Sequence, residues 1–157
     1  MMLRSHYIFS TGLLSLLIPF LHLNPYGGLI IASVISIISN SLIDYLGHEI
    51  KGKLVRRSPL THTFFRSMLW GLLSSSFIFI YYILKGDITL YPLIMGLISG
   101  PSHLFLDIFT ERGIYVKKKG KWRRFALAHF RYNNPIANSI AILLGFALIF
   151  VSINAPQ

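Results

Sequence analysis

Long stretches without a charged side chain constrain this chain more than any other feature of its sequence. No Asp, Glu, Lys or Arg occurs between Arg4 and Asp44, and three further uncharged runs cover residues 67–84, 88–106 and 132–157. A helix of roughly 20 apolar residues crosses the ~30 Å hydrocarbon core of a bilayer. The runs lack the alternation of polar and apolar residues that is typical of membrane barrel strands, so they indicate helices.

The first uncharged run is too long for one helix, and the turn-forming residues 24–28 (Asn-Pro-Tyr-Gly-Gly) divide it. The sequence therefore predicts an all-α fold: a polytopic membrane helix bundle with about five transmembrane helices in a single integral-membrane domain, residues 1–157. We expect no strands, and we expect Pro19 to kink the first helix. The predicted helices cover residues 7–23, 28–46, 63–84, 88–109 and 135–153, and a basic cytoplasmic loop covers residues 112–134.

Composition narrows the class of protein further. Apolar residue types make up 54% of the chain and charged types only 13%, whereas a soluble domain carries roughly 25% charged residues. High hydrophobicity excludes disorder, and the lack of cysteine excludes a disulfide scaffold and thiolate metal ligands. A soluble nucleic-acid-binding protein reaches the net charge of +10 but is rarely this apolar.

The positive charges are distributed unequally between the two sides of the predicted bundle. With five spans, 14 of the 15 Lys and Arg side chains lie on the side of the N-terminus, and Lys85 alone lies on the other side. Loops rich in Lys and Arg stay in the cytoplasm. The sequence thus predicts a multi-pass protein of the cell membrane whose N-terminus is cytoplasmic and whose C-terminus is outside. No Ala precedes Ala32, so the first run lacks a signal-peptide cleavage site and is expected to be a retained span.

Two acidic residues lie near the cytoplasmic ends of predicted helices, where a charge is costly. A carboxylate at the bilayer centre costs ~2.5–3.5 kcal/mol on insertion scales, and such residues usually face partners inside the bundle. Asp44 is followed four residues later by His48, and His103 is followed four residues later by Asp107. Residues spaced in this way share a helix face, so each helix is expected to present one imidazole and one carboxylate to the bundle interior.

Two more histidines, His6 and His62, begin predicted helices on the same side of the membrane. Imidazole and carboxylate without thiolate suit Zn²⁺, Mn²⁺, Fe²⁺ or Ni²⁺, with zinc as the default. A structural hydrogen bond within each pair is the alternative interpretation. His22 and His129 are expected outside the site. The predicted metal ligands are His6, Asp44, His48, His62, His103 and Asp107.

The motifs resemble the YdjM-like family of LexA-regulated, membrane-bound, metal-dependent hydrolases, of which the chain looks like an archaeal relative. The resemblance rests on residues 5–10, 42–48, 57–63 and 100–113, and its clearest block is Ser-His-x-x-x-Asp-x-x-Thr-x-x-Gly at residues 102–113. The order of ligands is also similar to that of zinc-dependent phospholipase C. Because Arg56 and Arg57 stand where the family has a histidine, the resemblance implies one or two metal ions rather than three.

The leading prediction is a hydrolase that holds a divalent metal ion, by default Zn²⁺, at the cytoplasmic face and acts on a phosphoester such as a phospholipid. Asp44, Asp107 and Arg57 are the predicted catalytic residues: a carboxylate takes a proton from water, and Arg57 binds the phosphate. The basic stretch 117–124, with Trp122, is expected to contact anionic lipid headgroups of the bilayer, although its main role is to fix orientation. Nucleic acid is a less favoured partner.

Two other functions are compatible with the same residues. A small membrane metal-ion carrier would use intramembrane His and Asp as a relay. A non-enzymatic membrane protein would use the His–Asp pairs only to lock its helices together.

Overall fold

Asparagine and proline determine where two of the helices begin. The Asn24 side chain accepts a hydrogen bond of 3.0 Å from the backbone N–H of Gly27, and Asn134 accepts one of 3.0 Å from Ala137. Each asparagine is followed by a proline, which fits the first helical turn because its missing N–H needs no partner there. These caps explain why α3 and α6 begin at Pro25 and Pro135, close to the predicted starts at residues 28 and 135.

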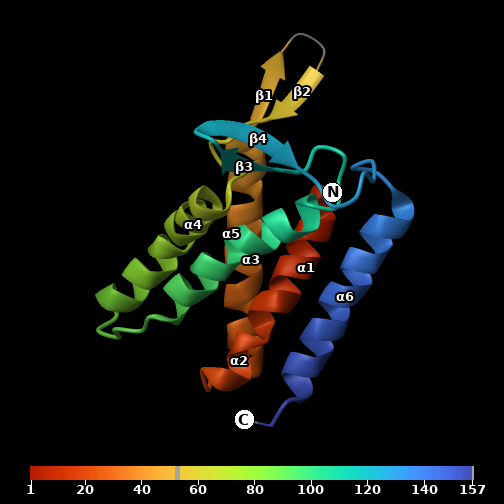
Figure 1. Ribbon diagram of the computed structural model, residues 1–157. Helices are drawn as coiled ribbons and strands as arrows, with labels where there is room; N and C mark the ends of the chain where they lie inside the picture. The colour runs from red at the N-terminus through yellow and green to blue at the C-terminus, as the bar shows by residue number, and fades with distance from the viewer. Residues whose placement is uncertain (52–53, 157) are drawn as a thin grey trace.

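The computed structural model describes residues 1–51 and 54–156. Over these residues the chain is mostly helical, with five helices of at least 13 residues, one four-residue helix and two β-hairpins (Figure 1). The elements are α1 (Leu3–Ser15), α2 (Leu17–Phe20), α3 (Pro25–Gly47), β1 (His48–Lys51), β2 (Leu54–Arg57), α4 (Phe64–Leu84), α5 (Tyr91–Asp107), β3 (Ile114–Lys118), β4 (Lys121–Phe125) and α6 (Pro135–Asn154).

Pro19 interrupts the first helix, as expected from the sequence. A proline ring clashes with the carbonyl four residues earlier and cannot donate a hydrogen bond to it. That carbonyl belongs to Ser15, the last residue of α1. The Ser152 hydroxyl of α6 donates a hydrogen bond to the Ser15 oxygen instead, so the break between α1 and α2 leaves this carbonyl satisfied.

The expectation that the chain has no strands was wrong. Strands β1 and β2 pair antiparallel with His48 opposite Arg57, and β3 and β4 pair antiparallel with Ile114 opposite Phe125. The second hairpin turns at Lys119 and Gly120, both with positive φ (49° and 77°), the geometry that suits the twist of a two-residue hairpin turn. The charge of residues 112–134 predicts only a basic loop, and the turn at Lys119 and Gly120 within it was not predicted.

Both hairpins and the N-terminus lie at one end of the bundle, and the C-terminus lies at the other (Figure 1). Helix α1 packs against α3 and α6, α4 packs against α5, and α3 contacts both α4 and α5. Buried apolar side chains such as Leu14, Ile35 and Met95 fill the space between the helices. The basic residues of both hairpins therefore lie at one end of the bundle, while Lys53 lies outside the described residues.

Small residues let α4 and α5 approach closely. A Cβ atom on Gly71 would collide with the carbonyl oxygen of Gly96, and one on Gly100 would collide with the carbonyl of Ser67. A Cβ on Gly96 would likewise meet Gly71 and the hydroxyl of Ser75. Helices in a bilayer lack a hydrophobic drive to associate, so close backbone packing through small residues supplies much of their attraction.

The outer surface of the bundle is apolar, as expected for contact with lipid. Three helices, α3, α4 and α6, are long and apolar enough to cross a membrane, so the chain is a multi-pass membrane protein. Helix α5 has 17 residues and α1 has 13. Of the about five predicted spans, three are therefore candidate spans in the described part of the chain. Exposed apolar side chains on α4 and α6 include Phe65, Leu69, Leu73, Phe77, Ile80, Ile140, Leu143, Phe146 and Phe150.

We predict that Gly96→Leu destabilises the protein by about 1–3 kcal/mol, because the new side chain must displace the backbone of α4. The measurement is the unfolding midpoint in detergent micelles. Ala147→Leu on the exposed surface of α6 is the matched control and should leave the midpoint unchanged. Equal stability of the two variants would contradict the proposed close packing of α4 against α5.

Candidate metal centre

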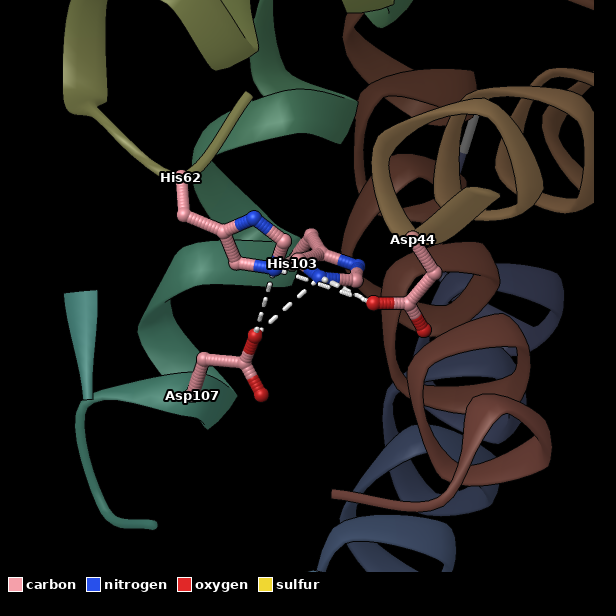
Figure 2. Close-up of side chains that lie close together, drawn as sticks. All are labelled: Asp44, His62, His103 and Asp107. Atoms are coloured by element: carbon pink, nitrogen blue, oxygen red, sulfur yellow. Dashed lines mark ion pairs between the residues drawn. The ribbon is translucent and has the colours of Figure 1, made fainter. Parts of the chain in front are cut away.

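Four ionisable side chains from three separate segments meet at the hairpin end of the bundle (Figure 2). Asp44 lies in the last turn of α3, His103 and Asp107 lie in the last two turns of α5, and His62 lies in the turn between β2 and α4. One ligand atom from each of these four residues, the ligand cluster, lies within 4.8 Å of the other three. His62, His103 and Asp107 are completely buried, whereas the side chain of Asp44 is 18% exposed.

The separations within the ligand cluster are typical of atoms that share an ion. His103 Nε2 lies 3.5 Å from Asp44 Oδ1 and 3.1 Å from Asp107 Oδ2. His62 Nε2 lies 3.7 Å and 3.6 Å from the same two oxygens. Most of these distances exceed the hydrogen-bond range of about 2.7–3.2 Å. Ligands on a tetrahedral zinc ion with bonds of about 2.0–2.1 Å are separated by roughly 3.3–3.4 Å.

The hydrogen bond between His103 and Asn40 determines which ring nitrogen of His103 faces the ligand cluster as an acceptor. The Asn40 amide nitrogen donates to the carbonyl oxygen of Ser36 at 2.7 Å, and this contact fixes the orientation of the amide. Asn40 Oδ1 then lies 2.8 Å from His103 Nδ1. Because Oδ1 can only accept, Nδ1 must carry the proton, and the neutral ring keeps its lone pair on Nε2.

His62 has the same arrangement with a different partner. The Thr61 hydroxyl donates its single proton to the carbonyl oxygen of Ile43 at 2.8 Å. The same Oγ1 lies 2.8 Å from His62 Nδ1, so it must accept from that nitrogen. The lone pair of the neutral His62 ring is therefore also on Nε2 and directed at the ligand cluster.

With both imidazoles neutral, acceptor atoms face one another across the centre of the cluster. His62 Nε2, His103 Nε2 and Asp107 Oδ2 are among the buried atoms that have no hydrogen-bond partner within the described part of the chain. Unpaired buried acceptors cost free energy, and most native proteins satisfy them. A cation between them removes the repulsion, so the residues present fit a divalent metal ion.

The protonation of His62 also suits a metal ligand. Burial lowers the pKa of His62 from 6.5 to about 4, so its imidazole is neutral at pH 7. A metal ion needs the neutral imidazole, because the proton of the charged form blocks the lone pair. Burial likewise lowers the pKa of His48 below 6.5.

Gly47 makes room for His62 at the end of α3. A Cβ atom at this position would lie 2.5 Å from His62 Cε1 and would also collide with the Thr61 hydroxyl. The backbone of Gly47 holds the following turn as well, since its carbonyl oxygen accepts a 2.7 Å hydrogen bond from the N–H of Ser58. Gly47, the last residue of α3, therefore makes room for His62 in the ligand cluster.

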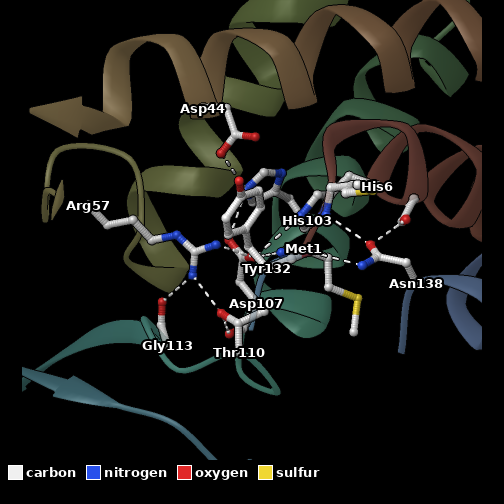
Figure 3. Close-up of polar contacts among 12 residues, drawn as sticks. Met1, His6, Asp44, Arg57, His103, Asp107, Thr110, Gly113, Tyr132 and Asn138 are labelled. Carbon is white, nitrogen blue, oxygen red and sulfur yellow. Dashed lines mark hydrogen bonds and ion pairs between the residues drawn. The ribbon is translucent and has the colours of Figure 1, made fainter. Parts of the chain in front are cut away.

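The other carboxylate oxygen of Asp107, Oδ1, contacts two cationic groups of the protein (Figure 3). Arg57 Nη2 lies 2.6 Å from Asp107 Oδ1, and the amino group of Met1 lies 2.9 Å from the same atom. Arg57 Nη1 also donates to the Thr110 hydroxyl at 3.0 Å and to the carbonyl of Gly113 at 2.8 Å. Arg57, which the sequence predicts to bind a phosphate, places its guanidinium against the carboxylate of Asp107 instead.

His6 and His48 lie at the edge of the ligand cluster. His6 is completely buried and stacks on His103 with ring centroids 4.0 Å apart, and its Nε2 lies 3.3 Å from Asp107 Oδ1. His48 does not share a helix face with Asp44, because α3 ends at Gly47 and His48 begins β1. The His48 Nδ1 atom nevertheless lies 3.8 Å from Asp44 Oδ1.

A cavity of about 390 Å³ borders Asp44, His48 and Arg57. It gives the ligand cluster access to the surroundings through Asp44. The remaining histidines, His22 and His129, are exposed, as are Glu49 and Glu111. Sequence reasoning did not identify Asn40 or Thr61, which orient the two buried imidazoles.

A family model described as a protein of unknown function, DUF1286, matches residues 1–106. The chain belongs to the DUF1286 family. The matched region includes His6, Asp44, His62 and His103 and ends immediately before Asp107. No curated protein and no solved structure matches the chain. Membership of DUF1286 assigns no function, and no named relative supports the YdjM-like or phospholipase C resemblance.

We predict that this DUF1286 protein, purified in detergent and incubated with Zn²⁺, retains about one equivalent of zinc after desalting. His62→Ala and His103→Ala should each lose it, because each removes a ligand whose lone pair faces the cluster. The measurement is metal content by inductively coupled plasma mass spectrometry. His129→Ala, which alters an exposed histidine, is the matched control and should bind as the wild type does.

Asn40→Ala should weaken zinc binding without abolishing it, since it removes the acceptor that orients His103 but removes no ligand. Loss of such a partner typically weakens metal binding by about 10- to 100-fold. Equal zinc content in the wild type and both histidine variants after reconstitution would argue against a metal centre.

Proposed function

We propose that this protein is a membrane-bound hydrolase that holds a divalent metal ion, Zn²⁺ by the chemistry of its ligands, and cleaves a phosphoester at the cytoplasmic face. The observation that carries the proposal is the set of buried acceptors on His62, His103 and Asp107, which face one another and lack partners within the described residues. A purely structural His–Asp pair would be expected to close its hydrogen bonds instead.

Access to the cluster supports catalysis over a purely structural ion. A closed structural zinc site uses four protein ligands, whereas a catalytic site keeps a position open to water or substrate. His62, His103 and Asp107 are completely buried and supply three ligands, whereas Asp44 is partly exposed toward a cavity of about 390 Å³, so in this proposal the fourth position is open to water. Asp44 is therefore the residue of the cluster that substrate or water can reach.

The chemistry divides between the ion and the chain. A bound divalent ion would supply Lewis acidity, which activates water near pH 7 and polarises the ester. Asp44 is placed to accept a proton from water, because its carboxylate borders both the cluster and the cavity. Arg57 donates to Asp107 Oδ1, which leaves Oδ2 directed at the imidazoles, and the Thr110 hydroxyl donates to the main-chain carbonyl of Asp107. In this proposal Asp44 is the proton acceptor, Asp107 is a metal ligand, and Arg57 is a positioning residue for Asp107.

One ion fits the cluster better than two. A second ion would need Asp107 Oδ1 together with His6 Nε2, which lies 3.3 Å away. The guanidinium of Arg57 already lies 2.6 Å from that oxygen, and a neighbouring cation repels a metal ion. His6 and His48, which the sequence predicts as metal ligands, then support the site from its edge.

The hairpin of β3 and β4 suits contact with anionic lipid headgroups of the bilayer. Every residue of β4 is exposed, including Trp122 and Phe125. Arg66 and Lys117 lie over the Trp122 ring, 5.4 Å and 5.9 Å from its centroid. Cations combined with an aromatic ring are typical of surfaces that bind the headgroup region. Nucleic acid is the less favoured partner, because the apolar surface keeps this hairpin near the membrane.

We predict that the zinc-loaded protein releases 4-nitrophenol from bis(4-nitrophenyl) phosphate or 4-nitrophenyl phosphate and that chelation abolishes this activity. Asp44→Asn should lower the rate by about 10²- to 10⁴-fold, the range for loss of a general base. The measurement is absorbance of nitrophenolate, with zinc content determined on the same samples. Asp87→Asn, at the opposite end of the bundle, is the matched control.

Two results would count against hydrolysis. The first is a zinc-loaded protein without activity on either ester. The second is an Asp44→Asn variant that keeps both its zinc and the full rate.

The proposed orientation gives a separate prediction. A reporter fused after Asn154 should score outside the cell, and one inserted at Gly120 in the β3–β4 turn should score inside. Alkaline phosphatase, which is active only outside, and a fluorescent protein, which folds only inside, give complementary readings. A cytoplasmic C-terminus would contradict the five-span orientation, because it would put the two ends of the bundle on one side.

A further inference from the structure

The cavity beside the ligand cluster has a second basic residue that the centre does not use. Arg112, which follows the end of α5 by five residues, lines it together with Asp44 and His48.

The two arginines of this cavity differ in their hydrogen bonds. The terminal nitrogens of Arg57 donate hydrogen bonds to Asp107, Thr110 and Gly113. Arg112 makes no hydrogen bond or ion pair with any described residue, and its guanidinium lies over the Tyr132 ring, 5.9 Å from the centroid. Stacking on an aromatic face holds a guanidinium in place and leaves its edge donors free for a ligand.

The charge around the cavity also favours an anion. The carboxylates of Asp44 and Asp107 balance the guanidinium groups of Arg57 and Arg112, and the amino group of Met1 adds one positive charge. A divalent ion in the cluster raises this excess to three positive charges in a partly enclosed space. An anionic ligand that touches both the ion and Arg112 would compensate this excess, since charges in a site shielded from water interact strongly.

The two groups that would bind this anion, Arg112 and the metal ion, indicate its chemical class. Arginine presents donors in a planar fork that matches two oxygens of one phosphate group, and a phosphate has further oxygens to offer the ion. The rest of the lining includes Met1, Met2, Leu3 and the Tyr132 ring, which suit the organic part of an ester. A volume of about 390 Å³ accommodates such a group.

We propose that this cavity binds the phosphate group of a phosphoester and that Arg112 is the residue that grips the phosphate oxygens. The inference rests on the proposed hydrolase for its metal ion, but it concerns binding rather than turnover. It assigns to Arg112 the role that sequence reasoning gave to Arg57. The phosphate can belong to a soluble ester or to a lipid headgroup, and the two sources share this chemistry.

The test uses phenylphosphonate, which carries the same anionic group but cannot be hydrolysed. Zinc-loaded protein in phosphatidylcholine nanodiscs is titrated with phenylphosphonate and followed by ³¹P NMR or calorimetry. Arg112→Gln should weaken binding by at least tenfold, and Arg112→Lys should weaken it less, because it keeps the charge but loses the fork. Lys85→Gln, which alters an exposed cation over the Tyr81 ring outside the cavity, is the matched control and should bind as the wild type does.

A second arm distinguishes the two sources of phosphate. Nanodiscs that contain phosphatidic acid should reduce phenylphosphonate binding if a lipid headgroup reaches the cavity, and they should leave it unchanged if only soluble esters enter. Zinc content and melting temperature of each variant are measured in parallel. Arg112→Lys keeps the test valid if Arg112→Gln fails to fold.

Failure of this inference and failure of the proposed function give different results. If Arg112→Gln keeps its zinc and binds phenylphosphonate like the wild type, the assignment of Arg112 is wrong, whether or not the protein hydrolyses esters. If binding depends on Arg112 but no phosphoester is cleaved, the binding site stands and the hydrolase does not.

Discussion

The carboxylate of Asp107 is completely buried at one end of a bundle whose outer surface is apolar, and its negative charge must be compensated there. Its two oxygens meet this requirement differently. Oδ1 is matched within the protein by the guanidinium of Arg57, 2.6 Å away. Among the described residues, Oδ2 faces the Nε2 atoms of His62 and His103, whose neutral forms present lone pairs rather than protons. Oδ1 therefore has a cationic partner within the protein, and Oδ2 is placed to contact a cation in the ligand cluster.

Both hairpins contribute to the site because their residues hydrogen-bond to Asp107 and to the backbone of His62. Arg57 ends β2, and its carbonyl oxygen accepts a 2.9 Å hydrogen bond from the Tyr115 hydroxyl of β3. The backbone N–H of Tyr115 donates to the carbonyl of His62 at 2.8 Å. Both hairpins are thereby fastened to the ligand cluster, one through an arginine and the other through a tyrosine. Because a buried arginine–carboxylate pair is sensitive to geometry, this bracing keeps Asp107 in one orientation.

Helix positions and several candidate ligands could be predicted from the sequence because each depends on local information. Uncharged runs place α3, α4 and α6 to within a few residues, and the four-residue spacing of His103 and Asp107 is preserved because α5 extends through both. The same spacing failed for Asp44 and His48, because it holds only if the helix continues and α3 ends at Gly47.

The remaining features depend on tertiary contacts. Asn40 is one of several polar residues on α3, and only the approach of α5 makes it the partner of His103. The pairing of Arg57 with Asp107 likewise joins residues 50 positions apart in the chain. Charge in the stretch 112–134 was sufficient to suggest a cytoplasmic loop, but it said nothing about how the backbone of that loop pairs.

The hydroxyl groups inside the bundle bear on the choice between a resident ion and a transported one. A conduit needs polar groups free to bind water or ions along its length. Here Ser39 shares a hydrogen bond with Ser99, Ser10 shares one with Ser102, and Ser36 donates to the carbonyl of Tyr7. The hydroxyls on α4, those of Ser74, Ser75 and Ser76, each donate to a carbonyl three residues earlier. These groups are used in packing, which is the usual role of small hydroxyl residues between membrane helices.

The access to the ligand cluster also bears on this choice. Asp44, the partly exposed ligand, borders the cavity at the hairpin end, so an ion in the cluster would exchange with that side of the bundle. Exchange with one side suits a resident ion better than a transported ion.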